Sequence, residues 1–229
     1  MTAATVPAAR CENVSVRYRT GSGVVDALRG VTMAFGRGQL SVVAGPSGSG
    51  KSSLLRTLAG LQPAHAGTVE VDGVDIGRLG ARALRRLRRR AIGFVLEEPA
   101  GNLLGCLRAQ EQVTFAARLR GGESSGPAEA GELLAALGLA DHADATPEEL
   151  SGGQQQRLAF AAAAVGRPAL LLADEPTATL DTASGVLLID AMRALVATGR
   201  TLVVSSHDPA VVAAADTVVQ LRDGQVVAA

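Results

Sequence analysis

Nine consecutive residues, GPSGSGKSS, have the types and spacing of a phosphate-binding loop. They match the pattern GxxxxGK[ST], in which glycines let the backbone curl so that successive N–H groups point at phosphate oxygens. Lys51 is the single lysine among 22 basic residues, and its slender ammonium suits the β- and γ-phosphates better than a planar guanidinium does. The loop is therefore expected to hold a nucleoside triphosphate, with the Ser52 hydroxyl on Mg²⁺. Its residues are Gly45, Pro46, Ser47, Gly48, Ser49, Gly50, Lys51, Ser52 and Ser53.

Two adjacent carboxylates end the apolar run ALLLADEP. Asp174, at the carboxyl end of a predicted buried strand, is expected to hold Mg²⁺ through its water shell. Glu175 follows it and is expected to take a proton from an attacking water. His207 comes after another apolar run, TLVVSS, and is either a sensor of the γ-phosphate or a surface histidine. His65 and His142 lie in loop-like contexts without evident partners, so we assign them no role.

The elements that must position these residues alternate between short apolar runs and longer helical patterns. This alternation is typical of βαβ units and a largely parallel sheet, an α/β fold. Three segments near the start, NVSVRYR, GVTMAF and GTVEVDGV, alternate apolar with polar residues and predict a small antiparallel sheet with a turn at Asp72-Gly73. Helical patterns between Arg108 and Gly166, interrupted by a predicted linker at 121–127, indicate an inserted helical subdomain. Continuous apolar runs predict buried strands at 40–45, 92–96, 169–173 and 201–206.

Length and charge narrow the class of protein. A chain of 229 residues is long enough for one α/β domain and too short for two full ones. Its 22 basic and 22 acidic residues give no net charge, which offers no general attraction to nucleic acid or anionic lipid. The guanine-reading pattern Asn-Lys-x-Asp is absent because the only lysine lies in the phosphate loop, so a GTPase is disfavoured.

Other composition signals concern compartment and surface. The longest apolar stretches fall short of the roughly 20 residues that a membrane-spanning helix needs, and the start of the chain lacks a secretory pattern, so we expect a cytosolic protein. Cys11 and Cys106 are isolated, which argues against a disulfide framework or a zinc site. The arginine-rich run ALRRLRRR at 83–90 is interpreted as a solvated helix face, with contact to lipid headgroups or an acidic partner as the alternative.

The segment LSGGQQQR at 150–157 indicates the class of nucleotide-binding protein. Together with the phosphate loop, ADEPTATLD and LRDGQVV, it resembles the ATP-binding subunit of an ABC transporter, over nearly the whole chain. The export-type group with lipoprotein-releasing and macrolide-efflux ATPases is the most similar. The resemblance implies a P-loop NTPase core with a mostly parallel sheet, a small antiparallel β subdomain and an inserted helical subdomain. It implies one domain at 10–229, with the ATP-binding core at about 10–96 and 167–229 and the helical signature subdomain at about 97–166.

The resemblance also implies roles for particular residues and partners. Tyr18 matches the aromatic residue that stacks on adenine. Asp181 matches a loop that crosses the interface between two such subunits, which sandwich two ATP molecules head to tail. The implied partners are that second subunit and a separate integral membrane permease, on the inner face of the cell membrane, with ATP and Mg²⁺ as cofactors. The residues that match the signature, expected to cap the ATP of the opposite subunit, are Ser151, Gly152, Gly153 and Gln154.

Three departures from the family pattern stand out. Glu97 replaces the glutamine that touches Mg²⁺ and the attacking water; it can still ligate the ion, and it places another negative charge near Glu175. Gly105 and Arg108 alter the segment that normally faces the permease. Ala162 replaces an arginine, which we interpret as a change in packing or in dimer contacts.

Three functions remain open from the sequence. The leading interpretation is an active Mg²⁺-dependent ATPase that drives a permease, with export favoured by the subgroup. The second, motivated by Glu97, is a slow or non-hydrolysing regulatory half of a heterodimer. The third is a protein of the same family that works on DNA or ribosomes, which the zero net charge and the lack of a second nucleotide domain disfavour, so no nucleic-acid partner is expected.

Overall fold

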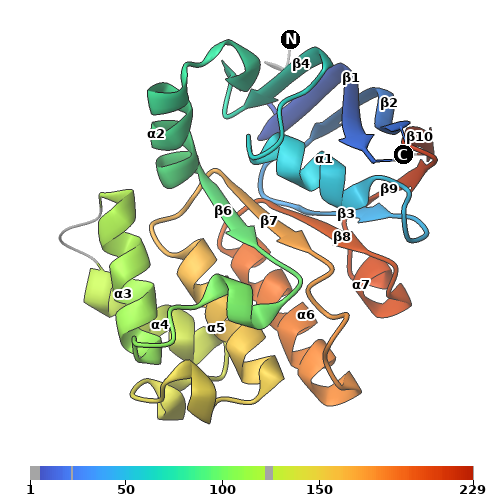
Figure 1. Cartoon of the computed structure of the whole chain (residues 1–229). Coiled ribbons are helices and arrows are strands. Elements are labelled where there is room, and N and C mark those ends of the chain that lie inside the picture. The colour runs from blue at the N-terminus through green and yellow to red at the C-terminus, as the bar shows by residue number, and fades with distance from the viewer. Residues whose placement is uncertain (1–5, 22, 122–125, 229) are drawn as a thin grey trace, which may run out of the picture.

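A six-stranded sheet forms the centre of the molecule (Figure 1). The computed structural model describes residues 6–21, 23–121 and 126–228. The strand order is β10-β9-β3-β8-β7-β6, and every neighbouring pair is parallel except β10 with β9. This sheet is the mostly parallel sheet that the sequence predicts. Its strands are β3 (Leu40–Ala44), β6 (Ile92–Val95), β7 (Leu170–Asp174), β8 (Leu202–Ser206), β9 (Thr217–Arg222) and β10 (Gln225–Ala228).

The predicted buried strands β3, β6, β7 and β8 are confirmed, because each pairs within this sheet and is largely buried. Successive residues of a strand point to opposite faces, so a strand covered on both sides contributes to two cores. Leu40 and Val42 of β3 pack in one hydrophobic cluster with the helices that follow β6, while Val43 packs in the other with α1 and the N-terminal strands. This double burial explains why these strands read as continuous apolar runs rather than as alternating ones.

A second, antiparallel sheet of order β2-β1-β4-β5 lies over the α1 side of the central sheet, as predicted. The predicted turn joins β4 to β5, where Asp72 and Gly73 both have positive φ angles, of 53° and 76°. Two consecutive positive φ angles match the tight turn that favours Asp-Gly. The strands are β1 (Ala9–Thr20), β2 (Gly23–Phe35), β4 (Ala66–Val71) and β5 (Val74–Asp75).

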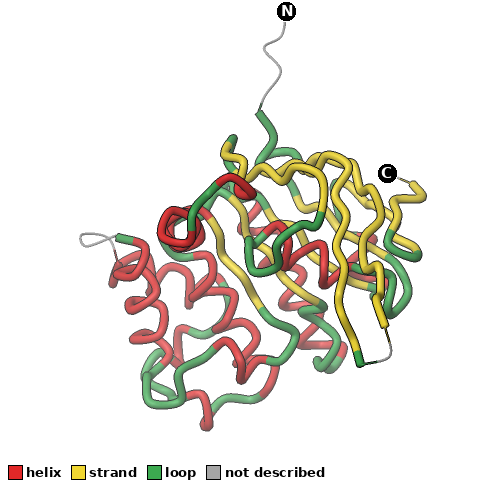
Figure 2. Tube along the Cα trace, turned by 45° about the horizontal axis from the view of Figure 1, so that its top comes forward, coloured by secondary structure: helices red, strands yellow, loops and turns green. Residues whose placement is uncertain are grey.

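Three helices, α3, α4 and α5, pack together on the opposite side of the molecule from the antiparallel sheet (Figures 1 and 2). Helix α4 begins at Gly126, so the predicted linker at 121–127 is too long at its end; its residues 122–125 lie outside the described residues. The helices are α1 (Lys51–Leu58), α2 (Ala81–Ala91), α3 (Ala109–Arg120), α4 (Gly126–Ala136), α5 (Gly152–Ala164), α6 (Thr182–Ala197) and α7 (Pro209–Ala213). Short 3₁₀ turns are η1 (Ile76–Arg78), η2 (Pro99–Asn102), η3 (Ala140–His142) and η4 (Pro147–Glu149).

The register of the central sheet brings the candidate residues to one edge. Ala44 at the end of β3 pairs with Ser206 of β8, and Asp174 at the end of β7 pairs with Ser205 of β8. Because parallel strands end at the same edge, the phosphate loop, the acidic pair and His207 all follow strand ends that lie side by side.

Candidate functional site

A cavity of about 540 Å³ lies at this edge of the sheet. The loop at 45–50 connects β3 directly to α1, whose N-terminus faces the cavity, so backbone N–H groups and the positive end of the helix dipole meet there. Gly50 caps the helix with a φ angle of 104°, a conformation that residues with a side chain rarely adopt. The predicted site residues that line the cavity are Tyr18, Pro46, Ser47, Gly48, Gly50, Lys51, Ser52, Ser53, Glu97, Glu175 and His207.

Lys51 is the cation at the floor of this cavity. Only 6% of its side chain is exposed, and its ammonium Nζ lies 2.8 Å from the Gly45 carbonyl, 3.1 Å from the Pro46 carbonyl and 3.1 Å from Glu175 Oε1. Three oxygens at these distances use the three donors of an ammonium group. A lysine is thus held at a fixed place where an anion entering the cavity meets it.

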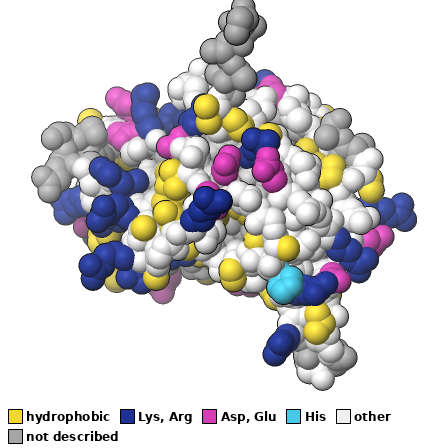
Figure 3. All heavy atoms as spheres, turned by 90° about the horizontal axis from the view of Figure 1, so that it is seen from above, with side chains coloured by type: hydrophobic (Ala, Val, Ile, Leu, Met, Phe, Trp, Pro, Cys, Tyr) yellow, Lys and Arg dark blue, Asp and Glu magenta, His cyan; other side chains and the backbone are white. Residues whose placement is uncertain are grey.

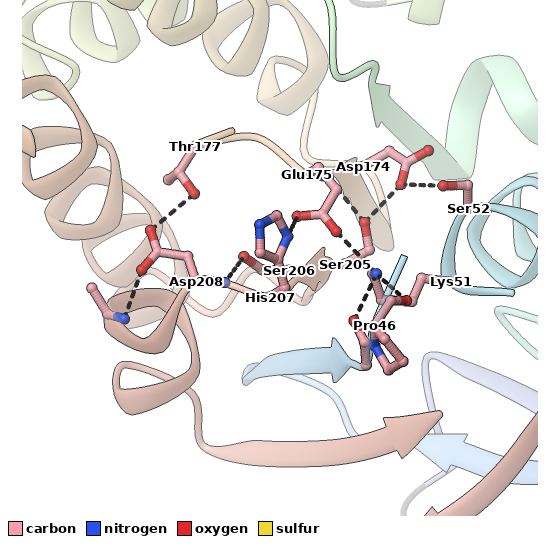
Figure 4. A network of polar contacts seen from close by, with 12 residues as sticks. Pro46, Lys51, Ser52, Asp174, Glu175, Thr177, Ser205, Ser206, His207 and Asp208 are labelled. Atoms are coloured by element: carbon pink, nitrogen blue, oxygen red, sulfur yellow. Dashed lines mark hydrogen bonds and ion pairs between the residues drawn. The ribbon is translucent and has the colours of Figure 1, made fainter. Parts of the chain in front are cut away.

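Asp174 lies beneath the cavity wall and is 4% exposed. Its Oδ1 accepts hydrogen bonds from Ser52 Oγ at 2.9 Å and from Ser205 Oγ at 2.7 Å (Figure 4). Burial of a carboxylate is costly unless such donors satisfy it. The pair Asp174 and Ser52 therefore presents two hard oxygen ligands side by side, one from each of two neighbouring elements, β7 and α1.

Glu175 is turned toward the cavity by an unusual backbone. Its φ angle is 43°, and its N–H donates to both the carbonyl and the hydroxyl of Ser205, at 3.1 and 2.9 Å. A non-glycine residue in the left-handed region is uncommon and is held there by its surroundings. One carboxylate oxygen contacts Lys51, and the other lies 3.0 Å from Nδ1 of His207, whose side chain is 70% exposed (Figure 4). The structure thus brings together Lys51, Glu175 and His207, which the sequence predicted as parts of one site.

Tyr18 and Glu97 both line the cavity. The Tyr18 hydroxyl donates to Ser53 Oγ at 3.2 Å, which fixes the ring beside the start of α1. Glu97 is exposed and follows β6. The side-chain amide of Asn102 is hydrogen-bonded to the residues on either side of Glu97. Leu96 N–H donates to Asn102 Oδ1 at 2.8 Å, and Asn102 Nδ2 donates to the carbonyls of Leu96 and Glu98. Asn102, which sequence reasoning missed, therefore sets the conformation of the loop that carries Glu97.

The signature residues do not line the cavity of their own chain. Ser151 caps α5: its Oγ accepts from Gln154 N–H at 3.3 Å, and Gln154 Oε1 accepts from Ser151 N–H at 2.8 Å. Gln154 Nε2 lies 2.8 Å from Nε2 of His142, so the sequence interpretation of His142 as a residue without a partner is wrong. Gly152 and Gly153 form the first turn of the helix, where Gly152 is exposed and Gly153 is buried.

Asp181 also lies outside the cavity and caps α6. It accepts hydrogen bonds from the N–H and hydroxyl of Ser184, both at 2.9 Å, and these bonds lower its pKa. A side chain at Gly153 would place its Cβ 2.6 Å from Ser184 Oγ. The starts of α5 and α6 thus meet closely, at a point where glycine is required by space rather than by backbone angle.

Two further observations concern metals and membranes. Among the described residues, no group of three or more His, Cys, Asp or Glu side chains is placed to hold a metal ion by itself. Within the same part of the chain, no helix has the length and apolar character needed to cross a bilayer.

A family model for the ABC transporter matches residues 28–178. The chain belongs to the ABC transporter family. The fold and the resemblance predicted from the sequence are thereby confirmed.

Relatives of this ABC chain include transporters and solved cassettes. It is 40% identical to the macrolide export ATP-binding/permease protein MacB 1/2 of Paracoccus denitrificans over 97% of its own length, but spans only 33% of that relative. An uncharacterized ABC transporter ATP-binding protein of Thermotoga maritima is 40% identical over 91% of this chain and 89% of its own. The dimeric post-hydrolysis structure of the ATP-binding cassette MJ0796 with ADP and Pi is 34% identical, with a TM-score of 0.87 over 96% of this chain and 97% of that one.

Sequence reasoning located most of the cavity of this ABC chain but missed Ser205. This residue is fully buried, donates to Asp174 and accepts from Glu175, so it links the two acids of the site. A signal was present, since two serines end the otherwise apolar run TLVVSS. Buried hydroxyls need partners, which the neighbouring strand end supplies.

Proposed function

We propose that this chain is an ATPase subunit that binds ATP with Mg²⁺ and hydrolyses it to power a separate membrane permease. The observation that carries the proposal is the arrangement around Lys51: its buried ammonium lies between the glycine-rich loop and the carboxylate of Glu175, at a helix N-terminus. Such a site suits a phosphate chain whose last phosphorus is to be attacked by water. Residues 10–229 are proposed to act as one domain, with an ATP-binding core at about 10–96 and 167–229 and a helical signature subdomain at about 97–166.

The residues present fit both ATP and Mg²⁺. A cavity of about 540 Å³ is in the range of small-molecule sites. Ser52 and Asp174 supply the hydroxyl and carboxylate oxygens that Mg²⁺ prefers, and because so few protein ligands are present, the ion is expected to complete its shell with phosphate oxygens and water. Bound there, Mg²⁺ supplies positive charge to the phosphate oxygens.

Each remaining group of the cavity has a proposed task. Glu175 accepts the proton of the attacking water, since its carboxylate is fixed by Ser205 at the backbone and by His207 at the side chain. His207 orients Glu175 and donates to the γ-phosphate. Tyr18 offers its ring to adenine beside Ser53.

A second ATP-binding subunit is part of the proposal. The signature lies at the start of α5 and does not line the cavity of its own chain, which supports contact with the ATP of a partner subunit. Its residues are Ser151 and Gly152, which are exposed, the buried Gly153, and Gln154. Both similar MJ0796 structures are described as dimeric. Asp181 is proposed to cross the same interface.

The proposed permease partner is separate from this chain and holds it at the inner face of the cell membrane. The support is threefold: relatives that are ATP-binding/permease proteins about three times as long, the family itself, and exposed apolar side chains on and before α3, namely Leu104, Phe115 and Leu119. Export is favoured because these relatives are macrolide export proteins. Nucleic acid is not a proposed partner, since the chain has no net charge.

Phosphate release from Mg²⁺-ATP by the purified chain tests the proposal. Glu175→Gln keeps the side-chain shape but removes the base, so the rate is expected to fall by about 100-fold or more. Glu132→Gln, an exposed residue on α4, is the matched control and keeps the rate. With hydrolysis blocked, Glu175→Gln is expected to accumulate as an ATP-bound dimer in size-exclusion chromatography. A chain that neither binds ATP nor responds to Glu175→Gln contradicts the proposal.

A slow regulatory subunit is the second candidate, and Glu97 is the observation that favours it. Glu97 lines the same cavity as Glu175, so two carboxylates and the phosphates of ATP share a small space. Like charges at close range repel one another, so the charge of Glu97 weakens the binding of the phosphates. Glu97→Gln removes the extra charge and is expected to raise turnover by about tenfold if the chain is the slow half. An unchanged rate of ATP hydrolysis in Glu97→Gln contradicts the slow regulatory function and favours the active ATPase subunit.

A further inference from the structure

A second cavity, of about 700 Å³, lies away from the nucleotide site and is lined by four arginines. It opens between α2, the turn that joins β4 to β5, and the loop before β7. Arg37 is paired with Asp72 at 2.6 Å, and Asp72 is the only carboxylate in the described lining. The other three arginines come from two separate elements: Arg86 and Arg90 from α2, and Arg167 from the loop before β7.

These three arginines are unpaired within the described part of the chain, where none has a side-chain hydrogen bond or an ion pair within 4.0 Å. Arg167 also borders a neighbouring cavity that is lined by Glu129 and Glu132. Glu129 is already bound to Arg200 at 3.4 Å and to the Gly166 N–H at 3.1 Å, and Glu132 does not form an ion pair with Arg167 within 4.0 Å. The cavity therefore holds a surplus of positive charge.

The surplus is local, because the whole chain is neutral. Helix α2 carries six arginines and no acid in 11 residues. Arg88 has a structural use, since it donates to the Gly60 carbonyl at 2.9 Å, but this bond leaves the cavity-facing arginines free. Figure 3, which views the molecule from above, shows several dark blue side chains close together on its left side, and others elsewhere on the same face. Clustered guanidinium groups repel one another, and an anion among them relieves that repulsion.

Arg167 also has an unusual backbone conformation. Its φ angle is 49°, in the left-handed region that a long side chain rarely occupies. Such strain is retained when the surroundings require it, and is common at ligand sites.

The geometry favours a phosphate over a carboxylate. Guanidinium groups that arrive from a helix and from a separate loop approach an anion from different directions, and a tetrahedral phosphate accepts from all of them, whereas a planar carboxylate accepts mainly in its plane. Between the arginines the lining is apolar, with Val74, Leu79 and Leu87 among its side chains. The organic group that is esterified to the phosphate can pack against these apolar side chains.

We propose that this cavity binds a phosphate ester, either as a free small molecule or as the headgroup of an anionic lipid. The proposal is independent of ATP hydrolysis, because none of its arginines lines the nucleotide cavity. The arginines are exposed, so binding is expected to be weak and to weaken further with salt.

The test measures binding of glycerol 1-phosphate to the full chain by titration calorimetry, without ATP, because ATP is itself a phosphate ester. Binding at the phosphate loop is common to all variants and therefore does not change between them. Arg86→Gln, Arg90→Gln and Arg167→Gln are each expected to raise the dissociation constant about fivefold. The matched controls are Arg82→Gln and Arg85→Gln, which remove the same charge from the same helix at positions that do not line the cavity. Circular dichroism and the melting temperature verify that each variant is folded.

A second arm distinguishes the two sources of phosphate. It measures sedimentation with vesicles made of equal parts phosphatidylcholine and phosphatidylglycerol, again for the lining and control variants. Loss in the lining variants alone supports the site, with glycerol 1-phosphate identifying a free ligand and vesicles a lipid one. Equal loss in lining and control variants shows attraction to the charge of α2 as a whole and overturns the site, as does the absence of saturable binding in both arms.

Discussion

The replacement Lys51→Arg preserves the charge at the centre of the nucleotide site and changes only its shape. The ammonium fits among three oxygens, those of Gly45, Pro46 and Glu175, at 2.8–3.1 Å, and the side chain is 6% exposed. A guanidinium is broader and planar, and in a space bounded by two backbone carbonyls it has to move outward by about 1 Å or displace the loop. A displacement of about 1 Å at a reacting group can cost about 100-fold in rate.

We therefore expect Lys51→Arg to lower the rate of ATP hydrolysis by about 100-fold or more, equivalent to about 2.7 kcal/mol of transition-state stabilisation. The assay is steady-state phosphate release at saturating Mg²⁺-ATP, with the dissociation constant of ATP measured separately. Arg56→Lys is the matched control: it makes the reverse exchange at an exposed position of the same helix and should change nothing. Near-normal turnover of Lys51→Arg would show that charge alone suffices and would refute the steric reasoning.

Other predictions concern the loop, the thiols and one capping acid. A Cβ at Gly50 would lie 2.4 Å from the Ala27 carbonyl oxygen, whereas a Cβ at Gly48 would meet nothing within 4 Å. Both glycines have positive φ angles, so the backbone strain of an alanine is similar at the two positions and only the contact differs. Urea unfolding should therefore show that Gly50→Ala lowers the free energy of unfolding by about 2 kcal/mol more than Gly48→Ala does. Burial raises the pKa of Cys11 to about 12, so iodoacetamide at pH 8 should label the exposed Cys106 and leave Cys11 unlabelled in mass spectrometry of the native chain. Hydrogen bonds from Arg193 and from the Leu40 backbone lower the pKa of Asp216 from its usual value. Its stabilising effect is therefore fully present at neutral pH and is lost as the pH falls through the lowered pKa of the folded state. Asp216→Asn should lower the melting temperature at pH 7, and the difference from the unmodified chain should shrink as the pH is lowered into the acid range.

The fold was largely predictable because its local signals agree with one another. Strands covered on both faces must be continuously apolar, so β3 and β8 were visible in the sequence. Asp72-Gly73 marks a tight turn by its chemistry alone. The end of the linker was misplaced because Gly126 and Pro127 read as loop residues, although helices admit both in their first turn.

The candidate site was predictable where a residue type is tied to one chemistry and not where its role arises from packing. Lys51 and Asp174 belong to spacings that bind phosphate and metal. By contrast, Asn102 matters through three hydrogen bonds around Glu97, and His142 through its contact with Gln154. Such contacts join residues that neither periodicity nor motif relates, so only the folded chain reveals them.

The close approach between the starts of α5 and α6 affects how mutations of the signature are to be interpreted. Gly153→Ala pushes a methyl group against Ser184, which Asp181 holds by two hydrogen bonds, so that variant disturbs two loops at once. A loss of activity in Gly153→Ala therefore has two causes that cannot be separated: crowding inside its own subunit, and loss of contact with the nucleotide of a partner subunit. Gly152 has open space around its missing Cβ. Gly152→Ala is therefore the cleaner probe of contact across a subunit interface, and the ratio of the two effects measures how much of the signature's role lies inside its own subunit.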